Sequence, residues 1–185
     1  IHSLSYLEFL EFHKLAASTQ SLRQYLTIGG LPYLSNLPLD RDIDFEYLRN
    51  VYSTIMLKDV VKRESIRNVD FLESLALYTA DNVGNLFSAN NISRYLKSQH
   101  VSISPLQVIN YLRALQNAYL INKVRRIDVN GLKTFEIGDK YYFEDLGLRN
   151  CHFGFNMQKD INKLMENAIY LHLANKQYEI YTGQQ

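Results

Sequence analysis

The sequence predicts a mainly α-helical chain with a small β-hairpin wing, followed by the truncated start of an α/β region. Three observations favour this fold. Apolar residues recur at helical spacing over much of the chain up to Tyr119. The spacing then becomes that of a strand from Leu120 to Val129. The pair Asn130-Gly131, a strong signal for a two-residue hairpin turn, follows directly.

The composition restricts the class of protein before any motif is considered. The 185 residues are 46% hydrophobic, enough for one domain or two small ones, and the net charge is +1. The single cysteine, Cys151, cannot form an internal disulfide, which fits a reducing cytoplasm. No apolar run approaches the ~20 residues that span a bilayer. No signal peptide opens the chain, and Ile1 is not a natural start, so we expect a cut N-terminus.

The first third of the sequence predicts three helices. Ser5 and Glu8 form a capping box that begins a helix reaching about Lys14. A second helix is expected from about Ser21 to Ile28, with Gly29 as its left-handed C-cap residue and Pro32 preventing its continuation. A polar turn over residues 38–42 then leads to a longer helix from about Asp44 to Arg63.

The middle third predicts a winged helix, the helix-turn-helix variant with an added β-ribbon. Three helices are expected at about residues 70–82, 89–98 and 104–119. The first helix begins at a cap formed by Asp70 and Glu73, and the second follows Ser88. The third begins at a Ser104–Gln107 capping box, with Pro105 in its first helical position. The motif is completed by three strands and a turn. They are the strand from Leu120, the Asn130-Gly131 turn, a returning strand over residues 132–137 and a third strand over 140–144.

The last segment predicts a helix from Asp160 to Asn175 and a strand beginning at Tyr178 to Tyr181. Together these elements suggest four regions. They are an N-terminal helical part at 1–40, a connecting helix at 41–68, the winged-helix domain at 69–150 and the start of an α/β region at 151–185.

The stretch Gly29-Gly30-Leu31-Pro32 allows two interpretations. A phosphate-binding P-loop needs Gly-Lys-Ser or Gly-Lys-Thr after its glycines and a strand before them, and both are absent here. Local chemistry therefore favours a helix C-cap and turn. On its own the stretch is not expected to bind a nucleotide.

Catalytic and metal-binding patterns are not recognisable. The five histidines lack metal-ligand spacing, none pairs with Cys151, and no Ser-His-Asp arrangement can be argued. We therefore predict no catalytic and no metal-binding residues in this chain. Glu166 is a carboxylate on an otherwise apolar helix, so it should either bond to a neighbour or reach solvent, or else belong to a site.

The third helix of the predicted winged helix has two distinct faces. Val108, Leu112, Leu115 and Tyr119 fall on one stripe, and Gln107, Asn110, Arg113 and Asn117 on the opposite one. Between residues 94 and 133 the chain carries seven basic residues and one acidic residue, Asp128. The candidate nucleic-acid-binding residues are Arg94, Lys97, Gln107, Asn110, Arg113, Lys123, Arg125, Arg126 and Lys133. The alternative is that this domain only packs between other domains.

Several stretches together resemble the C-terminal half of a group of prokaryotic AAA-type ATPases. They are LSYLEFLEF at 4–12, GGLPYL at 29–34, VYSTIMLKDVVKRESIRN at 51–68, LKSQHVSISPLQVINYLRAL at 96–115, KYYFEDLGLRN at 140–150 and LMENAIYLHL at 164–173. In that family an ATPase core precedes a conserved domain of unknown function. The resemblance covers essentially the whole chain, and neither Walker motif lies within it.

This resemblance implies roles that the residues alone do not. Gly29, Gly30 and Pro32 match a stretch of the small helical lid that faces the nucleotide, so the first region would be a lid remnant. ATP and Mg²⁺ are implied for the full-length protein, whereas the isolated chain should bind ATP negligibly. Glu166 would match the first helix acid of a restriction-endonuclease-like core, whose remaining strand residues are missing here.

The predicted function is therefore a non-catalytic part of an ATPase whose winged helix binds duplex DNA or acts as an effector module. The alternative is a scaffolding module that couples the lid to other domains or to subunits of an oligomer. A remoter alternative is part of a degenerate nuclease. The partners expected in each case are an ATPase core in cis and no membrane.

Overall fold

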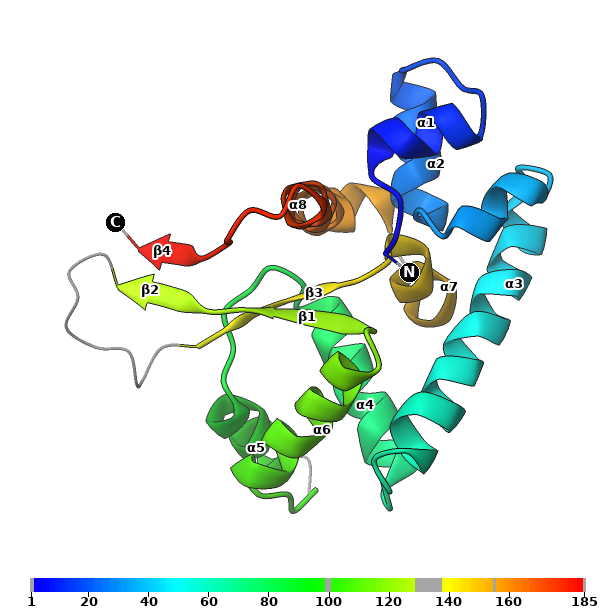
Figure 1. The fold of residues 1–185 in the computed structure, drawn as a ribbon. Coiled ribbons are helices and arrows are strands. Elements are labelled where there is room, and N and C mark those ends of the chain that lie inside the picture. Colours follow the sequence, from blue (N-terminus) through cyan, green and yellow to red (C-terminus); the bar gives the residue numbers. More distant parts are fainter. Residues whose placement is uncertain (1, 99–100, 129–137, 155, 185) are drawn as a thin grey trace. The chain divides into compact units, whose positions relative to one another are not determined.

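The computed structural model describes residues 2–98, 101–128, 138–154 and 156–184 and is mainly helical (Figure 1). Its described part contains eight α-helices and four short strands, which form two two-stranded sheets. Contacts group the chain into two units, Ile1–Met56 with Phe143–Glu179, and Leu57–Tyr142 with Ile180–Gln185. We call them unit 1 and unit 2. The four regions expected from the sequence stay a prediction.

Capping residues determine the start of the first two helices of unit 1 and the end of the second. Helix α1 spans Tyr6–Phe12, and the Ser5–Glu8 capping box is confirmed. Helix α2 spans Thr19–Ile28 and starts two residues before its predicted position, because Ser18 forms its own capping box with Ser21. Gly29 is confirmed as the C-cap residue of α2, with φ of 76°.

The long predicted third helix is divided into two kinds of helix. Helix α3 spans Arg41–Thr54 behind the N-cap residue Asp40, and a π-helical stretch, η2, continues it over Ile55–Lys62. Within this stretch Leu48 and Tyr52 are buried, whereas Val51 and Ile55 are partly exposed. Between α2 and α3, Pro32 begins a short 3-10 helix, η1, at Pro32–Asn36.

Unit 1 is completed by two helices, one of which the sequence did not predict. Helix α7, Leu146–Phe153, packs against both α2 and α3. Helix α8 spans Met157–Asn175 behind the N-cap residue Asn156. The largest fully buried side chains of the unit are Arg149, Tyr25, Tyr52, Phe9, Phe143, Leu26, Leu34 and Leu48.

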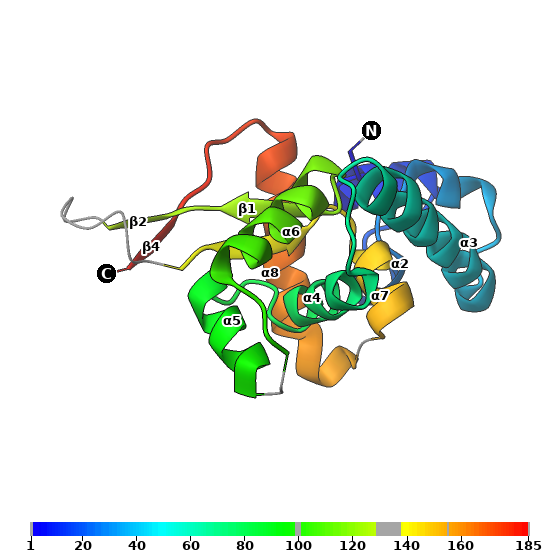
Figure 2. The same ribbon diagram turned by 90° about the horizontal axis from the view of Figure 1, so that it is seen from below.

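Three helices open unit 2 close to their predicted positions. Helix α4 spans Val69–Asp81, but its N-cap residue is Asn68 and not Asp70, because the Asn68 side chain accepts from the Phe71 N–H. Helix α5, Ala89–Ser98, follows Ser88 as expected. Helix α6 spans Pro105–Asn117, and its Ser104–Gln107 capping box is confirmed. Helices α5 and α6 lie side by side in both views (Figures 1 and 2).

Short strands follow α6. Strand β1, Ile121–Val124, pairs with β3, Lys140–Phe143, and an isolated antiparallel bridge joins Phe87 to Asp139. Strand β2, Arg126–Asp128, pairs in parallel with β4, Thr182–Gln184, so that Arg126 lies opposite Thr182.

Of the predicted strands, one is present in part, one lies outside the described residues and one is wrong. The strand expected at residues 120–129 is present in its described part, although it is interrupted at Arg125. The predicted turn at Asn130-Gly131 and the return strand lie outside the described residues. The strand expected at Tyr178–Tyr181 is wrong, since β4 begins only at Thr182.

Candidate functional site

The two glycines after α2 lie against a buried carboxylate. The Gly30 N–H donates to Asp145 Oδ2 at 2.8 Å, and the Gly30 carbonyl accepts from the Leu4 N–H at 2.7 Å. A Cβ atom on Gly29 would lie 2.3 Å from Asp145 Oδ1, and one on Gly30 would lie 2.4 Å from the Leu4 carbonyl oxygen. Only glycine therefore allows the backbone to approach this closely at either position.

Asp145 connects three segments that are far apart in the sequence. Its side chain is fully buried and accepts hydrogen bonds from Ser3 Oγ at 2.5 Å, from the Gly30 N–H and from the Leu148 N–H at 2.9 Å. Burial raises the pKa of Asp145, while the Ser3 hydroxyl and the N–H groups of Gly30, Leu148 and Gly147 oppose that rise. These contacts stabilise the fold around the N-terminus of α7.

This geometry bears on the prediction that Gly29, Gly30 and Pro32 face a nucleotide. Gly29 and Gly30 are buried around Asp145, and Pro32, the first residue of η1, is half-buried. The structure thus gives both glycines a packing role within unit 1. A role toward nucleotide stays a prediction, as does the dependence on ATP and Mg²⁺.

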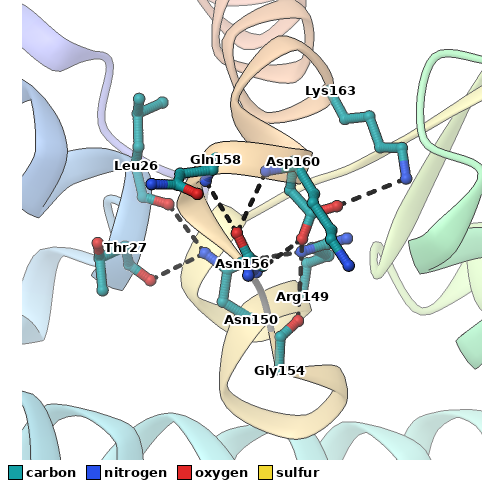
Figure 3. A network of polar contacts seen from close by, with 10 residues as sticks. Leu26, Thr27, Arg149, Asn150, Gly154, Asn156, Gln158, Asp160 and Lys163 are labelled. Carbon is teal, nitrogen blue, oxygen red and sulfur yellow. Dashed lines mark hydrogen bonds and ion pairs between the residues drawn. The ribbon is translucent and has the colours of Figure 1, made fainter.

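A polar network lies between α7 and the start of α8 (Figure 3). Arg149 is 2% exposed and donates to Asn150 Oδ1 at 3.0 Å and to the Gly154 carbonyl at 3.3 Å. Its guanidinium lies 3.8 Å from Asp160 Oδ2. Burial would raise the pKa of Asp160, but the Asn156 N–H, Arg149 and Lys163 together lower it.

Two buried side-chain amides form hydrogen bonds with backbone groups of other elements. The Asn150 side chain donates to the carbonyls of Leu26 and Thr27, at 2.8 and 3.0 Å, at the end of α2 (Figure 3). The Asn167 side chain accepts from the Phe143 N–H and donates to the Phe143 carbonyl, both at 2.8 Å. Sequence reasoning missed both residues.

One signal could have identified Asn167. It stands between Leu164 and Leu171 on one helical stripe, and an amide on a buried stripe must find partners. The neighbouring carboxylate of Glu166, which the sequence marked as a candidate, is only half-buried. Within the described ranges, no group of three or more His, Cys, Asp or Glu side chains could hold a metal ion.

Cys151 is unsuited to nucleophilic chemistry. The thiol is buried in α7, and burial raises its pKa to about 12. A thiol that stays protonated at neutral pH is a poor nucleophile and a poor metal ligand. Cys151 therefore serves packing.

The two predicted faces of α6 are largely confirmed by burial. Val108, Leu112 and Leu115 are buried, but Tyr119 is 69% exposed, because the helix ends at Asn117 and Tyr119 has a φ of 54°. On the opposite face all four predicted polar residues are exposed; they are Gln107, Asn110, Arg113 and Asn117.

Two of these four polar side chains already have partners. Gln107 Oε1 accepts from the Ser104 backbone and hydroxyl, each at 3.1 Å, as part of the capping box. The Asn117 amide donates to Glu64 Oε1 at 3.0 Å. The exposed polar surface of α6 consequently depends most on Asn110 and Arg113.

The predicted basic residues differ in accessibility. Arg94 and Lys97 on α5, and Arg125 between β1 and β2, are exposed. Arg94 donates to the side chain of Asn91, one turn earlier in the same helix. These three side chains and Arg113 lie on the surface of unit 2.

Other predicted basic residues are partly engaged. Lys123 forms an ion pair with Asp139 at 2.6 Å. Arg126 is half-buried, and its Nε has no hydrogen-bond partner among the described residues. Lys133 lies outside the described residues. Nucleic-acid binding by these groups stays a prediction.

Comparisons with known proteins identify relatives without an established function. Residues 19–159 match the family described as "Domain of unknown function (DUF8612)". An "Uncharacterized protein" of Haemophilus influenzae is 29% identical over 187 residues, covering 99% of this chain and 46% of that protein. "Uncharacterized protein MJ1544" of Methanocaldococcus jannaschii is 26% identical over 184 residues, covering 94% of this chain and 40% of that protein.

This chain thus spans less than half the length of these two relatives. No solved structure is significantly similar to it. Among the described helices, none is both long and apolar enough to cross a bilayer.

Proposed function

The chain belongs to the DUF8612 family of unknown function, and we propose that its unit 2 is a winged helix that binds duplex DNA. The order of its elements supports this proposal. Helices α4, α5 and α6 are followed by the paired strands β1 and β3, and the bridge between Phe87 and Asp139 adds a short extended segment between α4 and α5. This order is typical of winged helices, whose third helix contacts DNA.

The observation that carries the proposal is the distribution of charge. From Asn82 to Ile127 the sequence has six basic residues and no acidic residue, so α5 and α6 carry no carboxylate. The basic residues are Arg94, Lys97, Arg113, Lys123, Arg125 and Arg126. Basic side chains on helices that carry no carboxylate suit contact with a phosphate backbone.

The contacts available favour binding with little sequence preference. Groups that could read base edges on α6 are few, since Gln107 is engaged in its capping box and Asn110 and Arg113 remain. Affinity should therefore come mainly from phosphate contacts, in the non-specific range of roughly 10⁻⁴ to 10⁻⁶ M. It should fall steeply as salt rises.

Fluorescence anisotropy with a labelled duplex at ~50 mM salt tests this function. Replacing Arg94 and Arg113 together with alanine should weaken binding to every sequence and flatten the salt slope by about two units. The matched control replaces Lys58 and Arg67, two exposed basic residues of unit 2 outside α5 and α6, and should retain most of the affinity. No binding by the unaltered chain at this salt concentration would exclude the DNA-binding function.

A specific observation supports one alternative, a protein-interaction module. Leu106 and Ile109 on α6 are 66% and 42% exposed, and apolar side chains on a helix surface also suit a protein partner. In that case Arg125 and Arg126 would meet acidic groups of a neighbouring domain. Replacing Leu106 and Ile109 with Ser would then disrupt assembly of the longer protein, while DNA would not bind the chain at low salt.

We place either module in a longer AAA-type ATPase, in which ATP and Mg²⁺ bind outside this chain and Gly29, Gly30 and Pro32 belong to the lid. The greater length of the relatives leaves room for such a core. Titration calorimetry of the chain alone with Mg-ATP should show no micromolar binding, because no Gly-Lys-Ser or Gly-Lys-Thr loop is present. Hydrolysis of ATP by the longer protein is the complementary measurement.

A further inference from the structure

A groove in unit 1 lies between α2 and the start of α3. Its volume is about 560 Å³, within the size range of small-molecule sites. Apolar side chains line part of it, and polar and charged groups line the rest; six of the lining residues are Arg23, Gln24, Ile28, Leu39, Arg41 and Asp44. Nothing in the proposed function of unit 2 uses this groove.

Asp44 gives the groove its chemical character. The residue is 1% exposed, and its Oδ1 has no hydrogen-bond partner among the residues that the structure describes. A buried carboxylate oxygen without a donor is costly, so it calls for a group that supplies one. Burial, with a smaller contribution from Asp40, raises the pKa of Asp44 to about 6, consistent with a carboxylate that lacks a compensating donor.

Cationic side chains line the same groove. Arg23 comes from α2 and Arg41 from the first turn of α3, where its guanidinium lies 5.2 Å from the centre of the Phe45 ring. The groove thus offers a carboxylate that needs a donor beside guanidinium groups that attract an anion. Neither an isolated amine nor an isolated anion would use both features.

We propose that this groove binds a small zwitterionic ligand of the amino-acid class, with its ammonium group on Asp44 and its carboxylate toward Arg23 and Arg41. The apolar side chains of Ile28 and Leu39 then accommodate the carbon skeleton. The groove is a site of unit 1 alone, so this proposal and DNA binding by unit 2 stand or fall separately.

A thermal-shift screen of the chain with free amino acids tests the proposal. A ligand that binds, present at roughly a hundred times its Kd, should raise Tm by about 5 °C or more. N-acetylation, which removes the ammonium charge, and conversion of the carboxylate to an amide should each abolish the shift. Retention of the shift by the N-acetylated form would show that Asp44 does not receive the ligand's donor.

Variants separate the site from general effects on folding. Asp44→Asn removes the charge with little change of volume and should weaken ligand binding at least tenfold by titration calorimetry. Asp42→Asn, at an exposed position in the same first turn of α3, is the matched control and should stay within twofold of the unaltered chain. Equal binding by Asp44→Asn, or no stabilisation by any amino acid, would overturn the proposal.

Discussion

Unit 1 and unit 2 use polar residues in opposite ways. In unit 1 the side chains of Asp145, Asn150 and Asn167 are buried, and each bonds backbone groups from distant parts of the chain. In unit 2 the candidate binding residues Arg94 and Arg113 are exposed on helices without carboxylates. Removal of a buried hydrogen-bonding side chain leaves the backbone groups that it bonded without a partner. Removal of an exposed charged side chain leaves no buried group unpaired, because water takes its place.

This difference separates stability from binding. Substitutions at the buried polar groups of unit 1 should cost folding free energy. Substitutions on the basic helices of unit 2 should alter affinity while leaving the fold intact. Asp44 is the exception, because it is buried in unit 1 and its Oδ1 has no hydrogen-bond partner in the described part of the chain.

Asp145→Ala should have the largest effect on stability. The substitution leaves the Ser3 hydroxyl and the N–H groups of Gly30 and Leu148 without an acceptor in a buried site. At about 1–3 kcal/mol for each orphaned group, we expect a loss of roughly 4 kcal/mol or more in urea unfolding. Asp139→Ala in unit 2, which breaks a single partly exposed ion pair with Lys123, should cost about 1 kcal/mol or less. Similar costs for the two variants would contradict the contrast.

Gly29→Ala tests whether close approach, rather than backbone strain alone, matters at this turn. Gly29 and Gly154 have similar positive φ angles of 76° and 70°, but a Cβ on Gly154 would meet nothing within 4 Å. Both variants carry the strain of that backbone region, whereas only Gly29→Ala also collides with Asp145. We expect Gly29→Ala to cost about 3 kcal/mol, roughly 2 kcal/mol more than Gly154→Ala, in parallel urea titrations.

The sequence predicted features determined by neighbouring residues. The capping boxes of Ser5 and Ser104 and the C-cap at Gly29 each involve residues within a few positions of one another, so short motifs were sufficient. The predicted burial of Tyr119 on the apolar face of α6 is wrong, because the helix ends earlier than the spacing of its apolar residues suggested. The sequence pattern likewise did not predict that residues 120–128 divide into two strands with different partners.

The buried polar centre of unit 1 could not be predicted for the opposite reason. Asp145 contacts Ser3 and Gly30, which are 142 and 115 positions away in the sequence, and no local pattern encodes such pairings. Helix α7 was missed because Gly147, a weak helix former, occupies its first turn, although its N-cap residue Asp145 is a local signal for a helix start. The GGLP stretch therefore suggested a turn, but not the carboxylate around which the turn is built.

Asp44→Asn should stabilise unit 1, in contrast to substitutions at the buried polar groups that have hydrogen-bond partners. The folded-state pKa of Asp44, about 6, lies above its ordinary value of 3.8, so the folded chain binds more protons than the unfolded chain between these pH values. Stability should therefore fall as pH rises from about 4 to about 6. The Asn variant should lose this part of the pH dependence and gain about 2 kcal/mol at pH 7. Urea titrations from pH 4 to pH 7 measure both, and a variant less stable at pH 7 would show that Asp44 has a partner in solution.

Arg113→Ala should have the smallest effect on stability and the clearest effect on affinity. The side chain is exposed on α6, so its removal should change the unfolding free energy by less than about 0.5 kcal/mol. If α6 binds DNA, losing one phosphate contact should still weaken binding and reduce the salt slope by about one unit. Arg67→Ala, at an exposed position before α4, should leave both quantities unchanged.

The combination of results at Arg113 is what distinguishes the two functions proposed for unit 2. A DNA-binding surface predicts lower affinity on every duplex with unchanged stability, because phosphate contacts carry no sequence information. A surface that meets a protein partner predicts no DNA binding at all, and Arg113→Ala would then have no measurable effect on the isolated chain. A loss of stability above about 1 kcal/mol would instead place Arg113 among the structural residues, and the contrast between the two units would fail at this position.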